Sequence, residues 1–269
     1  MNLNLNEKIV LVTGGSHGIG LETARLFAKE GSKVIICSRN IENLRIAKED
    51  IFDTTGVEVD IISTDVSKLE SLNSLVDYIK EKYKKLDILV NNAGTGTYKP
   101  FLEVTDEELV YGMEINFFAQ FRLTQRLIPL MIENGAGSIV NVSGSTGINI
   151  CPEPFFATCT GPAKSAEIRF TKNIAREFGK LNIRANCVVP GLVYTEKRFG
   201  KWEKEIAKKD LNEKEVEDTM KSWAPNNSTP NNRWGEPEEI ANLIVFTASD
   251  RGSYINGAVL VADGGQDKS

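Results

Sequence analysis

Short apolar runs rich in Val and Ile alternate along the chain with longer segments whose apolar residues recur at helical spacing. The runs that we expect to form strands are 9–13, 33–37, 57–62, 86–90, 138–142, 183–189 and 258–262. The segments that we expect to form helices are 18–30, 41–53, 68–83, 105–133, 161–179 and 236–248. Repeated strand-then-helix order is typical of a parallel sheet with helices on both faces. The pattern therefore predicts an α/β fold with a doubly wound, parallel, seven-stranded sheet.

One segment breaks this alternation. The stretch 196–221 is heavily charged, Trp202 and Trp223 lie near its two ends, and the turn-rich stretch 225–232 follows. We interpret 195–232 as a helical insertion into a single domain spanning 1–269, and expect it to form a lid over a cleft. The alternative is a solvated surface insertion that its tryptophans anchor to the body.

Composition narrows the class of protein. The chain has 269 residues, 41% of them hydrophobic, which suits one globular domain. Its apolar runs are shorter than the roughly 18 residues that cross a bilayer, and its first residues lack the pattern of a secretory signal. We therefore expect a cytoplasmic protein without a membrane partner. The net charge of −5 argues against a nucleic-acid partner.

Cysteine and histidine usage argues against a metal site. The four cysteines form no C-x-x-C pair, and His17 is the single histidine of the sequence. We expect no metal, and we expect Cys37 and Cys187 to be buried and reduced because they lie inside apolar runs.

A glycine-rich turn joins the first strand to the first helix at 13–20. Gly14 permits a tight turn, Gly18 lets the backbone approach a pyrophosphate, and Gly20 lets helix and strand pack closely. The following helix then offers free N–H groups to phosphate. Because strand, glycine turn, helix and second strand occur in this order, the segment predicts a Rossmann-type dinucleotide site.

Further motifs in the same order make the chain resemble the short-chain dehydrogenase/reductase family over residues 7–266. They are Thr13-Gly14-xxx-Gly18-Ile19-Gly20, Asp65, Asn91-Asn92-Ala93-Gly94, Asn116, Lys164, Pro190-Gly191 and Ala262-Asp263-Gly264-Gly265. The resemblance implies a nicotinamide dinucleotide with its phosphates on the glycine turn. The residues implied to hold it are Gly14, Ser16, His17 and Ile19 at the phosphates, Asp65 and Val66 at the adenine, Asn92, Ala93 and Gly94 at the ribose, and Pro190, Gly191, Val193 and Thr195 at the nicotinamide.

The end of the second strand bears on the choice of coenzyme. A dinucleotide without the 2′-phosphate usually meets an Asp or Glu here, but this chain has Ser38 and Arg39. A guanidinium suits a 2′-phosphate through charge-assisted hydrogen bonds, and His17 is a further candidate donor. We expect NADP(H) to be preferred, with NAD(H) as the alternative. Arg39 could instead be a solvent-exposed loop cation.

The active-site motif implied by the resemblance has a gap. Carbonyl reduction in the family relies on a tyrosine four residues before the lysine, and here Thr160 stands four residues before Lys164. The family's serine position falls on Gly144, so a register shift would be needed to bring Ser145 into the site. Tyr98 and Tyr194 are the remaining candidates for a phenol near the cleft.

A threonine hydroxyl relays a proton but is a poor anion, which disfavours simple alcohol oxidation. We therefore expect an NADP(H)-dependent reductase of a conjugated C=C or activated C=O in a small molecule. In that hypothesis Lys164 holds the ribose, Thr160 or Ser145 donates to the substrate oxygen, and Asn116 keeps a water chain in line with Lys164. The alternatives are a nucleotide-binding protein without catalysis and a non-redox dehydratase or isomerase. The resemblance also implies a homotetramer or homodimer.

Overall fold

The computed structural model describes residues 2–150, 156–196, 200, 212, 214–215 and 229–266. Most of the insertion expected at 195–232, including Trp202 and Trp223, lies outside these residues, as does Cys151. The lid interpretation therefore stays a prediction.

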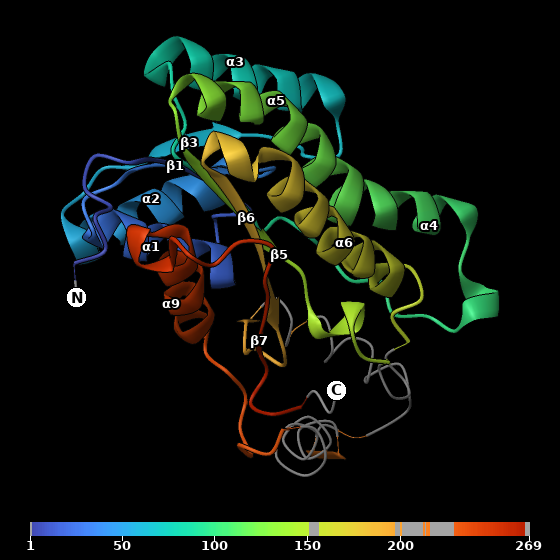
Figure 1. The fold of residues 1–269 in the computed structure, drawn as a ribbon. Helices are drawn as coiled ribbons and strands as arrows, with labels where there is room; N and C mark the ends of the chain where they lie inside the picture. Colours follow the sequence, from blue (N-terminus) through green and yellow to red (C-terminus); the bar gives the residue numbers. More distant parts are fainter. Residues whose placement is uncertain are drawn as a thin grey trace.

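Seven parallel strands form one twisted sheet in the order β3-β2-β1-β4-β5-β6-β7 (Figure 1). The strands are β1 (Ile9–Thr13), β2 (Lys33–Ser38), β3 (Asp60–Ser63), β4 (Ile88–Asn91), β5 (Gly137–Val142), β6 (Ile183–Pro190) and β7 (Val259–Ala262). Strands β1 and β4 are buried along their whole length because helices cover both faces. The predicted fold class is confirmed.

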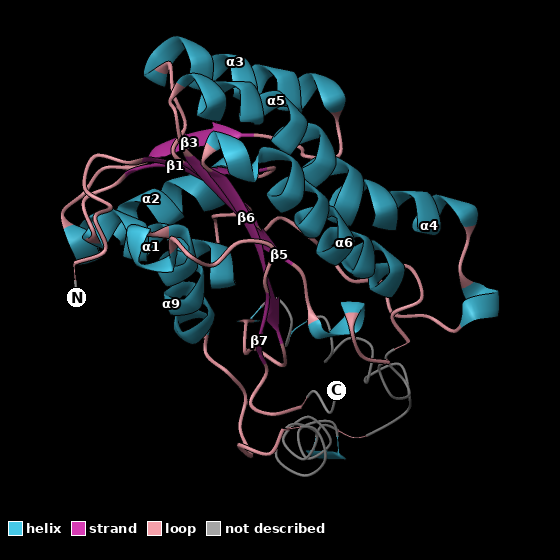
Figure 2. Ribbon diagram, in the orientation of Figure 1, coloured by secondary structure: helices cyan, strands magenta, loops and turns pink. Residues whose placement is uncertain are grey.

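Helices cover the sheet in two layers (Figure 2). One face packs against α1 (Gly18–Lys29), α2 (Ile41–Thr55) and α9 (Pro237–Ala248), with Phe27, Leu44 and Ile244 fully buried. The other packs against α3 (Leu69–Tyr83), α5 (Ala119–Glu133) and α6 (Thr160–Phe178), with Leu75 and Leu123 among its buried side chains. No helix within the described ranges has the length and apolar character needed to cross a membrane.

The helix expected over 105–133 is interrupted. It comprises α4 (Asp106–Met113), a π-helical turn at Glu114–Phe118, and α5. Thr105 caps α4 in a capping box with Glu108. At the wide turn the side chain of Asn116 donates to the Gly112 carbonyl at 2.9 Å, so a side chain satisfies a backbone acceptor there. A hydrophobic pattern alone does not detect such a turn.

Candidate active site

The nucleotide cleft lies at the carboxyl ends of the central strands. Strands β2 and β4 flank β1 on opposite sides, so the chain reverses its winding direction here, which is where ligands bind in doubly wound sheets. A cleft of about 400 Å³ opens at this point. Its lining includes these residues that the sequence singled out: Gly14, Ser16, His17, Gly18, Ile19, Gly20, Ser38, Arg39, Val66, Asn92, Ala93, Gly94 and Thr195.

The glycine turn is narrow in the way a phosphate cradle requires. A Cβ on Gly20 would lie 2.3 Å from the Gly14 carbonyl oxygen, so only hydrogen fits. Gly18 has φ +56°, and a Cβ there would lie 3.0 Å from Cγ2 of Thr195 across the cleft. The His17 side chain makes no capping bond to α1, which leaves the first amides of this helix available to an anion.

The far end of the cleft carries positive charge without a carboxylate. Arg39, Asn40 and Asn43 line it, and no described residue lining the cleft is an Asp or Glu. The Arg39 guanidinium donates to the phenol oxygen of Tyr111 at 3.1 Å, which fixes it from α4. This environment fits a 2′-phosphate better than an unmodified ribose.

Asp65 takes a different place from the other expected coenzyme residues. Its Oδ1 accepts hydrogen bonds from the backbone and side chain of Ser67, at 3.0 and 2.7 Å, and it is not among the residues lining the cleft. Its neighbours Thr64 and Val66 do line it. Asp65 therefore shapes the turn after β3 in this structure.

A second cleft of about 210 Å³ adjoins the first, and Ile19, Asn92, Gly94 and Tyr98 are among the residues common to both. It brings together the remaining residues that the sequence singled out: Asn116, Ser145, Thr160, Lys164, Pro190, Gly191 and Val193. The nucleotide cleft therefore opens onto the four expected catalytic side chains.

Thr160 is oriented by a neighbouring loop. It begins α6, and its Oγ1 accepts a hydrogen bond of 3.2 Å from the Thr97 amide. A second backbone bond, from the Lys99 amide to the Phe156 carbonyl at 2.9 Å, ties the same two segments together. A hydroxyl can accept and donate at the same time, so this bond does not prevent Thr160 from donating to a group in the cleft that it lines.

The two serines after β5 have different environments. Ser143 donates to the Lys164 carbonyl at 2.9 Å and supports α6 from behind. Both serines line the second cleft, but the Ser143 hydroxyl hydrogen is already used in that bond, whereas Ser145 starts a 3₁₀ turn. The structure thus places Ser145 on the same cleft as Thr160.

Asn116 is fully buried and fully bonded. Its Oδ1 accepts from the Thr95 amide at 3.0 Å, and its Nδ2 donates to the Thr95 carbonyl at 2.9 Å. A Cβ on Gly94 would lie 2.8 Å from its Oδ1 and 3.3 Å from Nζ of Lys164, so Gly94 permits the close approach. Asn116 therefore fixes the loop after β4 beside the lysine.

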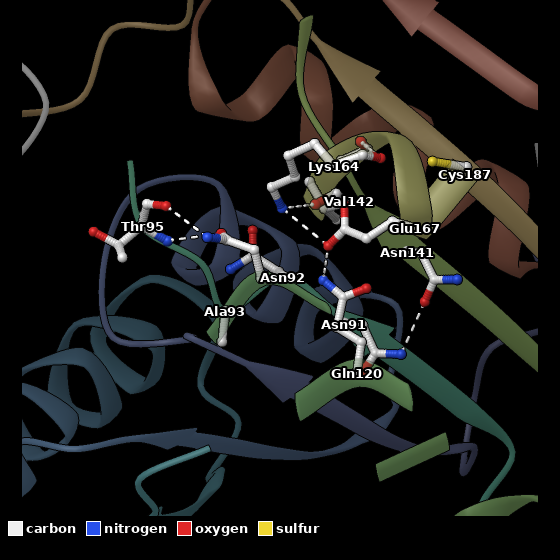
Figure 3. Close-up of polar contacts among 12 residues, drawn as sticks. Asn91, Asn92, Ala93, Thr95, Gln120, Asn141, Val142, Lys164, Glu167 and Cys187 are labelled. Carbon is white, nitrogen blue, oxygen red and sulfur yellow. Dashed lines mark hydrogen bonds and ion pairs between the residues drawn. The ribbon is translucent and has the colours of Figure 1, made fainter. Parts of the chain in front are cut away.

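Lys164 has a buried acidic partner that the sequence reading missed (Figure 3). Its Nζ lies 3.0 Å from Oε1 of Glu167 and donates to the Val142 carbonyl at 2.9 Å. Burial raises the pKa of Glu167 to about 7, although the charge and hydrogen bond of Lys164 act in the opposite direction. The available signal was an acid three residues after Lys164, on the helix face that also carries Phe170 and Ile174.

Two tyrosines were candidates for the missing phenol. Tyr98 lines both clefts, and its ring covers Gly96, where a Cβ would lie 2.8 Å from the phenol oxygen. Tyr194 lines neither of these clefts and is 41% exposed. Tyr98 is therefore the phenol that the structure brings to the site.

Taken together, the fold and its paired clefts define a doubly wound α/β protein with its ligand crevice at the topological switch point. A family model described as enoyl-(acyl carrier protein) reductase matches residues 14–267. The chain belongs to the short-chain dehydrogenase/reductase family, a family of oxidoreductases, and the expected family is confirmed.

Curated relatives and solved structures match along nearly the whole chain. The chain is 35% identical over 266 residues to a 3-oxoacyl-(acyl-carrier-protein) reductase of Chlamydia muridarum, covering 98% of this chain and 99% of the relative. It is 32% identical to the 7alpha-hydroxysteroid dehydrogenase of Escherichia coli K12, covering 98% and 96%. L-sorbose reductase from Gluconobacter frateurii, solved with NADPH and L-sorbose, superposes with a TM-score of 0.92 at 33% identity and covers both chains fully.

Proposed function

We propose that this protein is an NADP(H)-dependent reductase that transfers hydride to a conjugated C=C or an activated C=O of a small molecule. The observation that carries the coenzyme choice is that Arg39 lines the nucleotide cleft and that no Asp or Glu of the described part of the chain does. The structural relative solved with NADPH supports it.

The residues present fit this coenzyme. The glycine turn and the uncapped start of α1 would hold the pyrophosphate, Arg39 the 2′-phosphate, and Lys164 the nicotinamide ribose. When bound, the reduced coenzyme supplies a hydride. Val193 and Thr195 follow β6, where they would contact the nicotinamide end.

The active-site side chains favour an acceptor that needs oxyanion stabilisation rather than a strong base. Thr160 and Ser145 both line the second cleft, where their hydroxyl groups would donate hydrogen bonds to the acceptor. Donors of this kind stabilise the charge that develops on an enolate or alkoxide oxygen. Asn116 acts indirectly, because it holds the Thr95 backbone beside Lys164.

The test follows the loss of NADPH absorbance with four acceptors: a 3-oxoacyl thioester, a trans-2-enoyl thioester, L-sorbose and an aromatic aldehyde. Turnover of the enoyl thioester alone assigns C=C reduction, and turnover of an oxo compound assigns C=O reduction. Calorimetric titration with NADP⁺ accompanies the assay. Tight coenzyme binding without turnover of any acceptor would favour the nucleotide-binding protein without catalysis, and no binding at all would contradict the proposal.

We also propose that the protein is a homotetramer or homodimer that packs through the long helices. Leu109 and Val110 on α4 and Phe121 on α5 are large apolar residues that are 43%, 49% and 42% exposed. Light scattering after size exclusion tests this, and a monomer at micromolar concentration contradicts it.

A further inference from the structure

The carboxyl group of Glu167 is sealed beneath the catalytic cleft. The residue has 0% exposure, and its Oε1 receives hydrogen bonds from Lys164 and from the side-chain amide of Gln120 (Figure 3). Its other oxygen, Oε2, has no hydrogen-bond partner among the described residues. One carboxyl oxygen thus accepts a hydrogen bond from Lys164, and the other accepts none from the described residues.

Such an unmatched oxygen favours the protonated form of the acid. A buried carboxylate oxygen without a donor is costly, whereas a neutral carboxylic acid carries no charge to desolvate. The raised pKa of Glu167, about 7, has this burial as its main cause. Near neutral pH the group therefore exists in both protonation states.

Few other groups compete for this proton. Gln120 of α5 and Ser143 after β5 contact the carboxyl, and neither of them titrates. Cys187 of β6 is the other titratable neighbour among the described residues, and burial raises its pKa to about 12, so it stays a neutral thiol. Proton exchange at Glu167 is therefore coupled to Lys164.

Thr160 occupies the position four residues before Lys164 where the family has a tyrosine, and the ring of Tyr98, the phenol on the same cleft, packs over Gly96. If Lys164 gave a proton to a substrate oxyanion without a partner, it would become a buried neutral amine. The carboxyl group of Glu167 lies 3.0 Å from the lysine nitrogen, so it can supply a proton and keep the lysine charged.

We propose that Glu167 stores a proton for Lys164 and returns it to the lysine as the lysine protonates the reduced substrate. This inference rests on the proposed reductase function. It makes Glu167 a positioning residue that acts through Lys164, not a group that contacts the substrate.

With the coenzyme bound, which would supply a hydride, the reduced substrate would carry a negative charge on its oxygen. An N–H bond of the Lys164 ammonium breaks and an O–H bond forms on that oxygen. The O–H bond of the Glu167 acid then breaks and the N–H bond of Lys164 is restored, leaving a carboxylate beside an ammonium. After the product leaves, Glu167 takes up one proton from bulk solvent, which is the proton that the net reduction consumes.

The first experiment needs no turnover. Infrared difference spectra of the protein without coenzyme are recorded from about pH 5 to about pH 9. We expect the carbonyl stretch of a buried carboxylic acid to disappear with a midpoint near 7, and to be absent in Glu167→Gln. Glu177→Gln, an exposed change on the same helix, is the matched control and should keep the band. A spectrum in which Glu167→Gln removes no titrating band overturns the proposal.

The second experiment tests whether the stored proton is used. In the wild type the reduction rate should fall as pH rises through about 7, because only protonated Glu167 can resupply Lys164. Glu167→Gln should lower the rate about 10- to 100-fold and remove this limb of the profile, with NADPH affinity little changed. Glu177→Gln should keep both the wild-type rate and the fall in rate as pH rises through about 7. If Glu167→Gln reduces the rate but keeps the limb, Glu167 is merely structural and the proposal is wrong.

Glu167→Asp guards against a variant that fails to fold. It keeps an acid on the same helix face, so the infrared band and the rate limb should move together to a new midpoint. If the midpoint of the infrared band moves but the midpoint of the pH–rate profile does not, the proposal is wrong. Absence of turnover in the wild type, with the titrating band present, contradicts the proposed function but supports Glu167 as the titrating partner of Lys164.

Discussion

The guanidinium of Arg39 hydrogen-bonds the phenol oxygen of Tyr111 at 3.1 Å, so a residue that follows β2 and lines the nucleotide cleft is held by a side chain of α4. Removing Arg39 should therefore discriminate between the two coenzymes. In Arg39→Ala, NADPH affinity should fall about 10- to 100-fold, the equivalent of a charge-assisted hydrogen bond, while NADH affinity changes little. Tyr111→Phe, which keeps the charge, should show a smaller loss. Fluorescence titration with each coenzyme measures both, and equal losses for NADH and NADPH in Arg39→Ala would exclude the phosphate role.

Thr160 should matter for turnover and not for coenzyme binding. Thr160→Val keeps the shape of the side chain but removes the donor, so kcat should fall at least about 100-fold. Thr160→Ser, which keeps the hydroxyl, should retain most of the activity. Steady-state kinetics with the best acceptor measures kcat, and titration with NADPH measures coenzyme affinity separately. If Thr160→Val leaves kcat unchanged, Ser145 and not Thr160 is the donor to the substrate oxygen.

Tyr98 tests whether a phenol from another part of the chain replaces the missing one. We expect Tyr98→Phe to retain kcat within about threefold, because its ring packs over Gly96, whereas loss of a general acid costs at least about 100-fold. The pH–rate profiles of both proteins are compared. A loss of the larger size would identify Tyr98 as the proton donor and remove the need for Glu167.

Gly20 should tolerate no side chain. A Cβ there would meet the Gly14 carbonyl oxygen at 2.3 Å and Nδ2 of Asn92 at 2.5 Å, so Gly20→Ala should cost about 1–3 kcal/mol of unfolding free energy and weaken coenzyme binding. Gly56→Ala is the control, because its Cβ would meet nothing within 4 Å and only its φ of +72° opposes the change. Urea unfolding measures the first effect and calorimetry the second. A Gly56→Ala that weakens coenzyme binding equally would show that the effect is not local.

Asp87 should make stability depend on pH. Burial disfavours its charge, but hydrogen bonds from the Ile9 amide and Asn134, with Lys85 and Lys8 nearby, outweigh burial and hold the pKa of Asp87 below its ordinary value. A lowered folded-state pKa stabilises the protein above the unfolded value of about 3.9 and loses that contribution as pH falls below it.

Asp87→Asn should therefore cost about 1–3 kcal/mol at pH 7 and progressively less below about pH 4. Asp53→Asn, an exposed change on α2, should show little difference at either pH. Urea unfolding at pH 7 and pH 3.5 makes the comparison. A penalty for Asp87→Asn that is independent of pH would assign its effect to packing.

The sheet could be predicted because strands that are buried on both faces leave continuous apolar runs. The edge strand shows the limit of this reasoning. It was expected at 57–62 but lies at Asp60–Ser63, with Asp60 inside it. Both ranges contain Asp60, and Tyr78, Tyr83 and Lys82 hydrogen-bond its carboxylate, so α3 satisfies a charge at the start of this strand.

The nucleotide cleft was predictable because its motifs are local turns at strand ends. Residues that reach the site by tertiary packing could not be predicted from the sequence. Asn43 lines the cleft from a helix whose sequence carries no binding motif, and Ile115 lines it beside the motif residue Asn116. Glu167 lies three residues after Lys164 on α6, so spacing allows their contact, but packing of this helix face against β5 is what buries the pair. Spacing alone gives no measure of how deeply a charged side chain is buried.

The widened turn at Glu114–Phe118 fixes the angular phase of everything that follows it. A π-helical turn takes up one residue more than an α-helical turn, so it absorbs an extra residue that would otherwise rotate the following helix by about 100°. Without the wide turn, that rotation would carry Phe117 away from Phe170 of α6, against which it packs edge-on, and would separate Gln120 from Glu167. The wide turn therefore preserves the contacts that this part of the long helix makes with α6 beneath the lysine.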